Sequence, residues 1–88
     1  MRLELDPRGD IAYVHVADDV NATVKYTERV GESKEYERGI DFDADGRIVG
    51  YEFMNASQGL NLEGLPHGDE IADFLAVVAG LRVIQKAS

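Results

Sequence analysis

The chain contains no cysteine, and it carries only nine basic residues against seventeen acidic ones. Without cysteine, neither a disulfide nor a thiolate metal site can form. The net charge of −8 argues against direct binding to nucleic acid, because phosphate backbones are bound by lysine and arginine that displace counterions. The same shortage argues against attraction to anionic lipid. We therefore expect no direct nucleic-acid partner and no membrane partner.

Long apolar runs are also missing. The longest apolar stretch covers residues 74–81, far less than a bilayer span requires. The first residues lack the apolar run of a signal peptide, so we expect a cytoplasmic protein. The 88 residues are predicted to form one domain, 1–88, with a thin core that self-association would extend.

Motifs for catalysis are absent as well. No elbow motif surrounds any serine, and the glycines are spread singly rather than gathered in a phosphate-binding loop. His15 and His67 have no metal-ligand spacing. We therefore predict that the protein is not an enzyme and that it uses no cofactor.

Alternation of apolar and polar residues predicts an antiparallel sheet. The expected strands cover residues 3–5, 11–16, 23–30, 40–42 and 47–54, and a polar loop covers 31–39. Residues 11–16 are apolar on both faces, which is typical of a central strand. The turn formers of residues 6–10 and the Asp-Ala-Asp-Gly run of residues 43–46 predict two hairpins.

The last third of the chain predicts an irregular segment over residues 55–64, then a helix and a final strand over residues 81–84. The apolar stripe of the helix is Ile71, Phe74, Leu75 and Val78. Acidic residues mark its start and Gly80 its end. The expected fold is α+β: an antiparallel β-meander of about five strands, with one C-terminal helix packed on the sheet and a short final strand.

One segment matches the calcium-loop pattern D-x-D-x-D-G-x5-E, in which alternating carboxylates converge on a hard cation. The matching residues are Asp41, Asp43, Asp45, Gly46 and Glu52. Gly39 and the β-branched and aromatic residues of 48–53 argue against the flanking helices that such a site needs. We therefore predict a hairpin. The alternative is a domain that binds a cation or small ligand weakly through Asp41, Asp43, Asp45 and Glu52.

Several aromatic residues fall on the predicted strands, where they could form a surface for a protein partner. They are Tyr13, Tyr26, Tyr51 and Phe53. Together with the acidic charge, they favour a non-enzymatic protein-interaction module.

Two sequence runs resemble a known family: L-x-x-D-P-R-G-D-I-A-Y-V-H-V and I-D-F-D-A-D-G-R-I-V-G-Y-E-F-M-N-A-S, within residues 3–60. The chain is similar to the small prokaryotic family of domain of unknown function 2283. The matching positions are Asp10, Ile11, Tyr13, Asp43, Asp45, Gly46, Gly50, Glu52, Ala56 and Ser57.

This resemblance implies a compact β-meander in which Asp41–Glu52 is a hairpin. It implies no agreed activity, but it suggests an antitoxin-like inhibitor of a small basic protein. We expect the partner to be a basic protein or a second copy of this chain. The candidate binding residues are Asp10, Tyr13, Asp43, Asp45 and Glu52.

Overall fold

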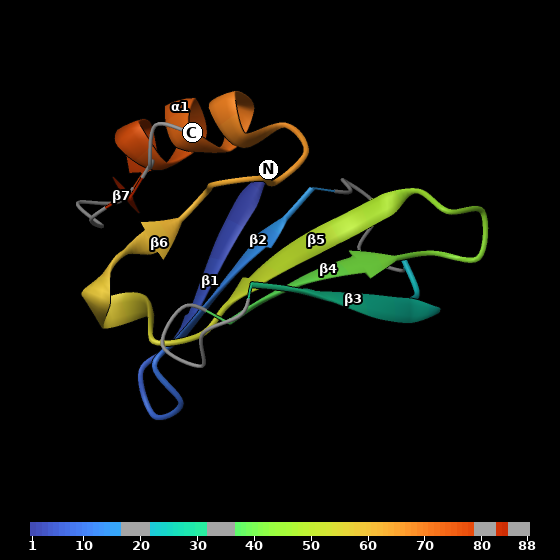
Figure 1. The fold of residues 1–88 in the computed structure, drawn as a ribbon, viewed down its shortest axis with the longest axis horizontal. Coiled ribbons are helices and arrows are strands. Elements are labelled where there is room, and N and C mark those ends of the chain that lie inside the picture. The colour runs from blue at the N-terminus through green and yellow to red at the C-terminus, as the bar shows by residue number, and fades with distance from the viewer. Residues whose placement is uncertain (17–21, 32–36, 79–82, 85–88) are drawn as a thin grey trace.

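The computed structural model describes residues 1–16, 22–31, 37–78 and 83–84, and it has the predicted α+β fold (Figure 1). The main sheet consists of β1 (Arg2–Asp6), β2 (Ile11–His15), β3 (Tyr26–Val30), β4 (Arg38–Phe42) and β5 (Ile48–Phe53). The short 3-10 helix η2 (Ala56–Gln58), β6 (Leu60–Asn61), the helix α1 (Gly68–Val78) and β7 (Val83–Ile84) follow.

All neighbours in the five-stranded sheet are antiparallel, in the order β1-β2-β5-β4-β3. The sheet therefore combines two sequential pieces, the β1–β2 hairpin and the β3–β4–β5 meander, joined where β2 pairs with β5. β2 is an inner strand, as its apolar residues on both faces predicted. The sequence did not indicate that its second neighbour would be β5.

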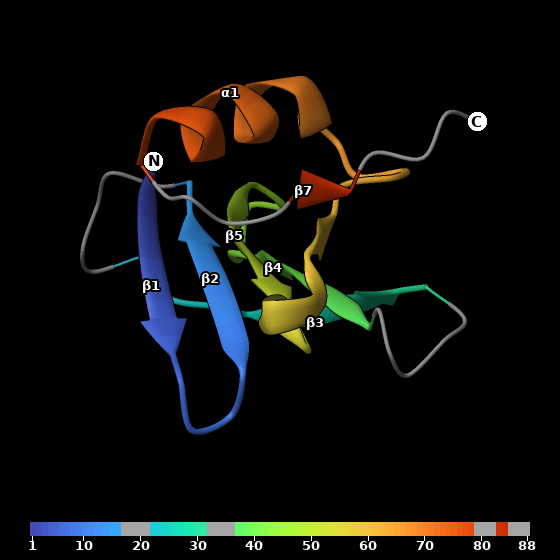
Figure 2. The same cartoon turned by 90° about the vertical axis from the view of Figure 1, so that its left-hand side faces the viewer.

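One face of the sheet is covered by the C-terminal elements, and we name it the covered face (Figure 2). Side chains from β2, β4 and β5 meet side chains from the segment after η2 in a single core. Its fully buried members include Val14, Tyr51, Phe53, Leu60, Ile71 and Leu75. The opposite face carries no helix or strand of the described residues, and we name it the open face.

The helix follows its predicted stripe. Ile71 and Leu75 are buried and Phe74 is half-buried against the core, whereas the side chain of Val78 and the expected end at Gly80 lie outside the described residues. The predicted final strand is present as β7, which pairs in parallel with β6. β6 and η2 lie in the segment predicted to be irregular. Within the described residues, no helix combines the length and apolar character needed to cross a bilayer.

Arg38 lies on the covered face, although the sequence placed it in the polar loop of residues 31–39. The side chain is only 7% exposed, and its Nη1 donates to the backbone carbonyls of Asn61 and Glu63. Burial lowers the pKa of the guanidinium. A buried charge is costly unless it is hydrogen-bonded, so these contacts tie β4 to the segment that covers the sheet. Residues 32–36 of the predicted loop lie outside the described residues.

The contact between α1 and the sheet can be tested with two substitutions in one helix. We expect Leu75→Ala, at a side chain 1% exposed, to lower the free energy of unfolding by about 2–5 kcal/mol, because it leaves a cavity in the core. Val77→Ala, at a side chain 86% exposed, is the control and should change it by less than about 0.5 kcal/mol. Urea unfolding measures both, and equal losses would contradict this packing.

Candidate functional site

The centre of the open face consists of two rows of residues that run across all five strands. The first row is Arg2, His15, Gly50, Asp41 and Thr27. The second row is Glu4, Tyr13, Glu52, Gly39 and Arg29. Each row contains one glycine, and in each case a long side chain from a neighbouring strand crosses it.

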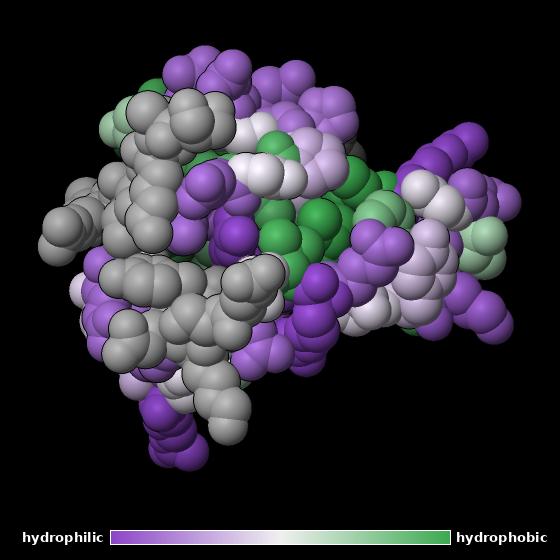
Figure 3. All heavy atoms as spheres, viewed as in Figure 1, coloured by the Kyte–Doolittle hydropathy of each residue, from purple (hydrophilic) through white to green (hydrophobic). Residues whose placement is uncertain are grey.

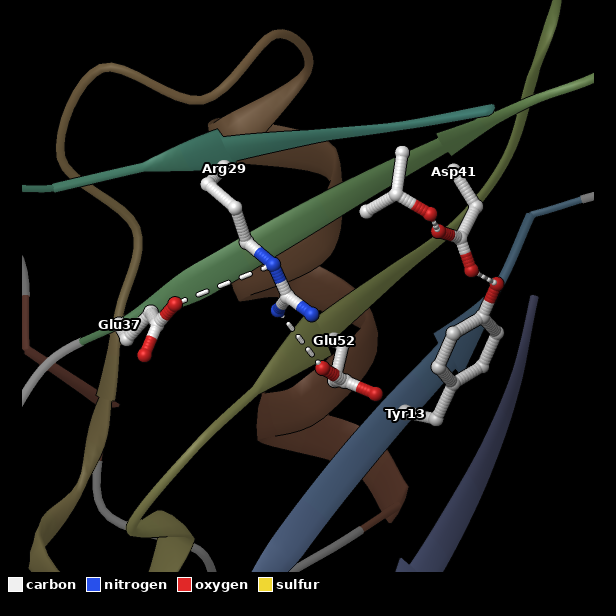
Figure 4. Close-up of polar contacts among 6 residues, drawn as sticks. Tyr13, Arg29, Glu37, Asp41 and Glu52 are labelled. Carbon is white, nitrogen blue, oxygen red and sulfur yellow. Dashed lines mark hydrogen bonds and ion pairs between the residues drawn. The ribbon is translucent and has the colours of Figure 1, made fainter.

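Tyr13 crosses Gly50 (Figure 4). Its hydroxyl donates to Asp41 Oδ2 at 2.6 Å, while Thr27 Oγ1 donates to Asp41 Oδ1 at 2.5 Å. A Cβ atom at Gly50 would stand 2.6 Å from Tyr13 Cζ, well inside van der Waals contact. Only glycine at position 50 therefore lets the ring span β5 and join β2 to β4.

Arg29 makes the corresponding connection from the other edge of the sheet. Its Nη1 donates to Glu52 Oε1 at 3.0 Å, and its Nε lies 3.8 Å from Glu37 Oε1 (Figure 4). A Cβ at Gly39 would stand 3.3 Å from Arg29 Nη1, so the guanidinium passes close over that glycine. The two glycines thus give the open face a continuous layer of polar side chains.

His15 and Glu4 extend this layer toward β1. His15 Nε2 lies 3.7 Å from Glu4 Oε1, and the rings of His15 and Tyr13 have centroids 4.6 Å apart. Among the described residues, the buried His15 Nε2 has no hydrogen-bond partner.

The electrostatics of the open face are dominated by carboxylates around one protonated phenol. Burial raises the pKa of Tyr13, and the hydrogen bond and charge of Asp41 raise it further. Glu52 and Glu4 act in the same direction. The phenol is therefore a stable hydrogen-bond donor at neutral pH and is not activated as a nucleophile or base.

The structure brings together three of the residues singled out from the sequence: Tyr13, Glu52 and Asp41. Asp43 and Asp45 lie instead in the β4–β5 turn, where Asp43 Oδ1 accepts the backbone N–H groups of Asp45 and Arg47. Within the described residues, no group of three or more histidine, aspartate or glutamate side chains is arranged to hold a metal ion. The carboxylates of Asp41, Asp43 and Glu52 thus have separate hydrogen-bond partners.

Asp10 lies in the β1–β2 turn, where its carboxylate meets η2. Its carboxylate accepts the backbone N–H and the hydroxyl of Ser57, at 2.8 and 2.6 Å, and its backbone carbonyl accepts the N–H of Ala56. Its φ of 53° is in the left-handed region, which aspartate tolerates better than most residues. Asp10 therefore fastens the β1–β2 turn to η2 and is not part of the open face.

Seven residues of the two rows were not among the site residues chosen from the sequence: Arg2, Glu4, His15, Thr27, Arg29, Gly39 and Gly50. The available signal was a glycine in the middle of a strand, which often marks a close approach of another group. Gly50 fits that description, whereas Gly39 lay at the end of the predicted polar loop of residues 31–39. The side chain that crosses each glycine comes from the neighbouring strand. Its identity therefore depends on the strand order, which the alternation of residues along the chain does not reveal.

The contact between Tyr13 and Gly50 predicts non-additive mutations. We expect Gly50→Ala to destabilise the protein by about 1–3 kcal/mol, since the added methyl group displaces the ring. In a Tyr13→Ala background the same substitution should cost much less, with a coupling of about 0.5–3 kcal/mol. Urea unfolding of the four proteins measures this coupling, and additive effects would show that the ring does not depend on the glycine.

The raised pKa of Tyr13 predicts a dependence of stability on alkaline pH. Because the folded protein holds this proton more tightly than the unfolded chain, the stabilisation is complete below a pH of about 10 and is lost above it. We expect Tyr13→Phe to remove this part of the alkaline loss. Tyr26→Phe, at an exposed ring, is the control. Urea unfolding across the alkaline range tests this, and identical profiles for Tyr13→Phe and the unsubstituted protein would contradict it.

Comparison with known proteins finds a family with no assigned activity. The family model described as "Protein of unknown function (DUF2283)" matches residues 2–57. The match covers β1 to β5 and every residue of the two rows, and it ends before β6, α1 and β7. No curated protein and no solved structure matches the chain.

Proposed function

The chain belongs to the DUF2283 family, and we propose that it is a non-enzymatic module whose open face binds a basic protein. The observation that carries this proposal is the layer of polar side chains centred on Tyr13. No element of the described residues packs over it. Its partner would be a protein surface with lysine or arginine side chains, placed to meet the carboxylates around the phenol.

The charges on and beside this surface favour a basic partner. The two rows together with the adjacent Glu37 contain four carboxylates and two arginines, a formal excess of two negative charges. The carboxylates are Glu4, Glu37, Asp41 and Glu52, and the arginines are Arg2 and Arg29. The net charge of −8 for the whole chain adds a long-range attraction that speeds and orients association with a basic protein.

The hydrogen bonds within the layer also favour binding. Tyr13, Asp41 and Arg29 are held by one another or by neighbouring side chains, so ordering them on association costs little conformational entropy. A tyrosine at the centre of a preorganised surface is a frequent anchor of protein–protein interfaces. The same contacts argue against catalysis, because Asp41 already accepts two hydrogen bonds and the phenol keeps its proton.

The family resemblance suggests a narrower version of this proposal. The module would act like an antitoxin by covering the basic surface of a small toxic protein. Coverage by an acidic surface is a physically sufficient means of inhibition when the basic surface is the one that binds substrate. In this version of the proposal, the protein supplies a complementary acidic surface, and the partner has the activity that is inhibited.

Two charge reversals distinguish the open face from a general effect of net charge. Glu4→Lys changes the open face, whereas Asp73→Lys makes the same change in charge at an exposed position of α1. A basic protein captured from the native host would be purified and its binding to each variant measured by calorimetry. We expect Glu4→Lys to weaken binding roughly fivefold and Asp73→Lys to have a much smaller effect.

Salt provides the second measurement. Raising the ionic strength from about 50 to about 300 mM should weaken binding substantially, since exposed charges are screened within a Debye length. Equal losses for Glu4→Lys and Asp73→Lys, or binding that does not respond to salt, would count against the open face as the docking surface. Failure to recover any basic protein would count against the proposed function itself.

A further inference from the structure

Among the residues that the structure describes, none forms a strand beside the outer edge of β3. β3 stands at the end of the strand order, and its only partner in the described part of the chain is β4 (Figure 1). Four of its five residues are exposed; Val30 is half-buried. An edge strand in this position presents a row of unpaired backbone groups that another strand can use.

The direction of the backbone groups on β3 follows from the pairing of the neighbouring strands. Met54 N–H donates to the Glu37 carbonyl, so these two residues form a hydrogen-bonded pair. The adjacent pair Arg38–Phe53 is then a non-hydrogen-bonded pair. In an antiparallel ladder, hydrogen-bonded and non-hydrogen-bonded pairs alternate. Along β4, the backbone groups of Gly39 and Asp41 therefore point to β5.

The intervening residues of β4 consequently point to β3. In the register of β3 with β4, Glu28 is opposite Ile40, so the backbone groups of Glu28 point to β4. The same alternation turns the backbone groups of Thr27 and Arg29 to the free edge. A strand that adds to β3 would form its hydrogen bonds with these two residues.

A second copy of the chain is a poor occupant of this edge. Antiparallel self-pairing through the outward groups can be centred on Thr27, Glu28 or Arg29. The first register puts Lys25 opposite Arg29, the second puts Glu28 opposite Glu28, and the third puts Arg29 opposite Arg29. Like charges directly opposite are destabilising.

Centring on Tyr26 avoids like charges, but it requires the backbone of Lys25 to face outward. The Lys25 N–H already donates to the Phe42 carbonyl, at 2.7 Å. These four self-pairing registers are therefore disfavoured, three by charge and one by the backbone. The charge pattern of β3 therefore disfavours pairing of this edge with the same edge of a second copy of the chain.

The position opposite Glu28 suits a lysine or arginine of an added strand. Glu28 is exposed, and among the described residues it has no ion-pair partner within 4.0 Å. On the same face, Tyr26 is 46% exposed and stacks on Phe42, with centroids 4.9 Å apart and rings 13° from parallel. Figure 3 shows hydrophobic residues at the surface between α1 and the β4–β5 turn.

We propose that an extended segment of a basic protein partner adds to β3 as a sixth, antiparallel strand of the sheet. A lysine or arginine of that segment lies opposite Glu28, and an apolar residue lies opposite Tyr26. Strand addition obtains affinity from main-chain hydrogen bonds and specificity from the alternating side chains. The inference rests on the proposed function in that the partner is basic, but it assigns a second surface, the edge, and a mode of recognition.

Two acetylated, amidated peptides test the edge directly. The first, Thr-Val-Glu-Lys-Thr-Val-Thr, places lysine opposite Glu28 when it pairs antiparallel with β3, and the second replaces that lysine with glutamate. Nuclear magnetic resonance titration of the full chain should show tighter binding of the lysine peptide, by roughly threefold to tenfold. The shifted amides should include those of Thr27 and Arg29, which should also exchange more slowly with solvent.

Charge exchange at one position supplies the matched control. In Glu28→Lys the preference should reverse, so that the glutamate peptide binds more tightly than the lysine peptide. Equal binding of the two peptides, no detectable binding of either, or shifts confined to the open face would overturn the proposal. Thermal unfolding of Glu28→Lys confirms that the variant is folded, as expected for an exposed side chain.

Self-association gives a measurement that needs no peptide. Glu28→Thr removes the facing charges of the register centred on residue 28, so we expect this variant to form dimers at concentrations where the unsubstituted chain is monomeric by light scattering. A monomeric Glu28→Thr would contradict the role of Glu28 in disfavouring self-pairing. If Glu4→Lys weakens binding of the basic protein but Glu28→Lys does not, strand addition fails while the proposed function stands.

Discussion

The passage of Tyr13 over Gly50 is the constraint on which the open face depends. A side chain at position 50 would occupy the space of the ring and break the bridge from β2 to Asp41 on β4. Arg29 repeats the arrangement over Gly39 in the opposite direction. Glycine normally weakens a strand, so two glycines in adjacent strands are explained by the polar layer that they permit.

The two faces of the sheet have different roles. The covered face supplies stability, because β6, α1 and the segment between them bring the apolar side chains that complete the core. Arg38 fastens this layer by hydrogen bonds to two backbone carbonyls. The open face is thereby free to carry polar side chains that bind a partner in our proposal, and the free edge of β3 adjoins it.

Much of the fold followed from local patterns in the sequence. The apolar residues on both faces of β2, the turn formers of residues 43–46 and the apolar stripe of Ile71 and Leu75 are each visible within a single element. The start of β4 could not be predicted in this way. Arg38 and Gly39 resemble loop residues in the sequence, and Arg38 is accommodated in the strand because its guanidinium donates to two backbone carbonyls. The short strand β6 was missed for a similar reason, since it forms only through pairing with β7.

The sequence by itself determined the α+β class, the acidic charge and the hairpin of residues 40–54, since propensity, turn chemistry and composition are local or additive properties. Only the tertiary structure decided which side chains form the candidate site. The strand order β1-β2-β5-β4-β3 places Tyr13, Glu52 and Arg29 side by side, and it leaves Asp10 and Asp43 in turns. Neighbours across a sheet are set by strand order and register, which depend on the packing of the whole chain.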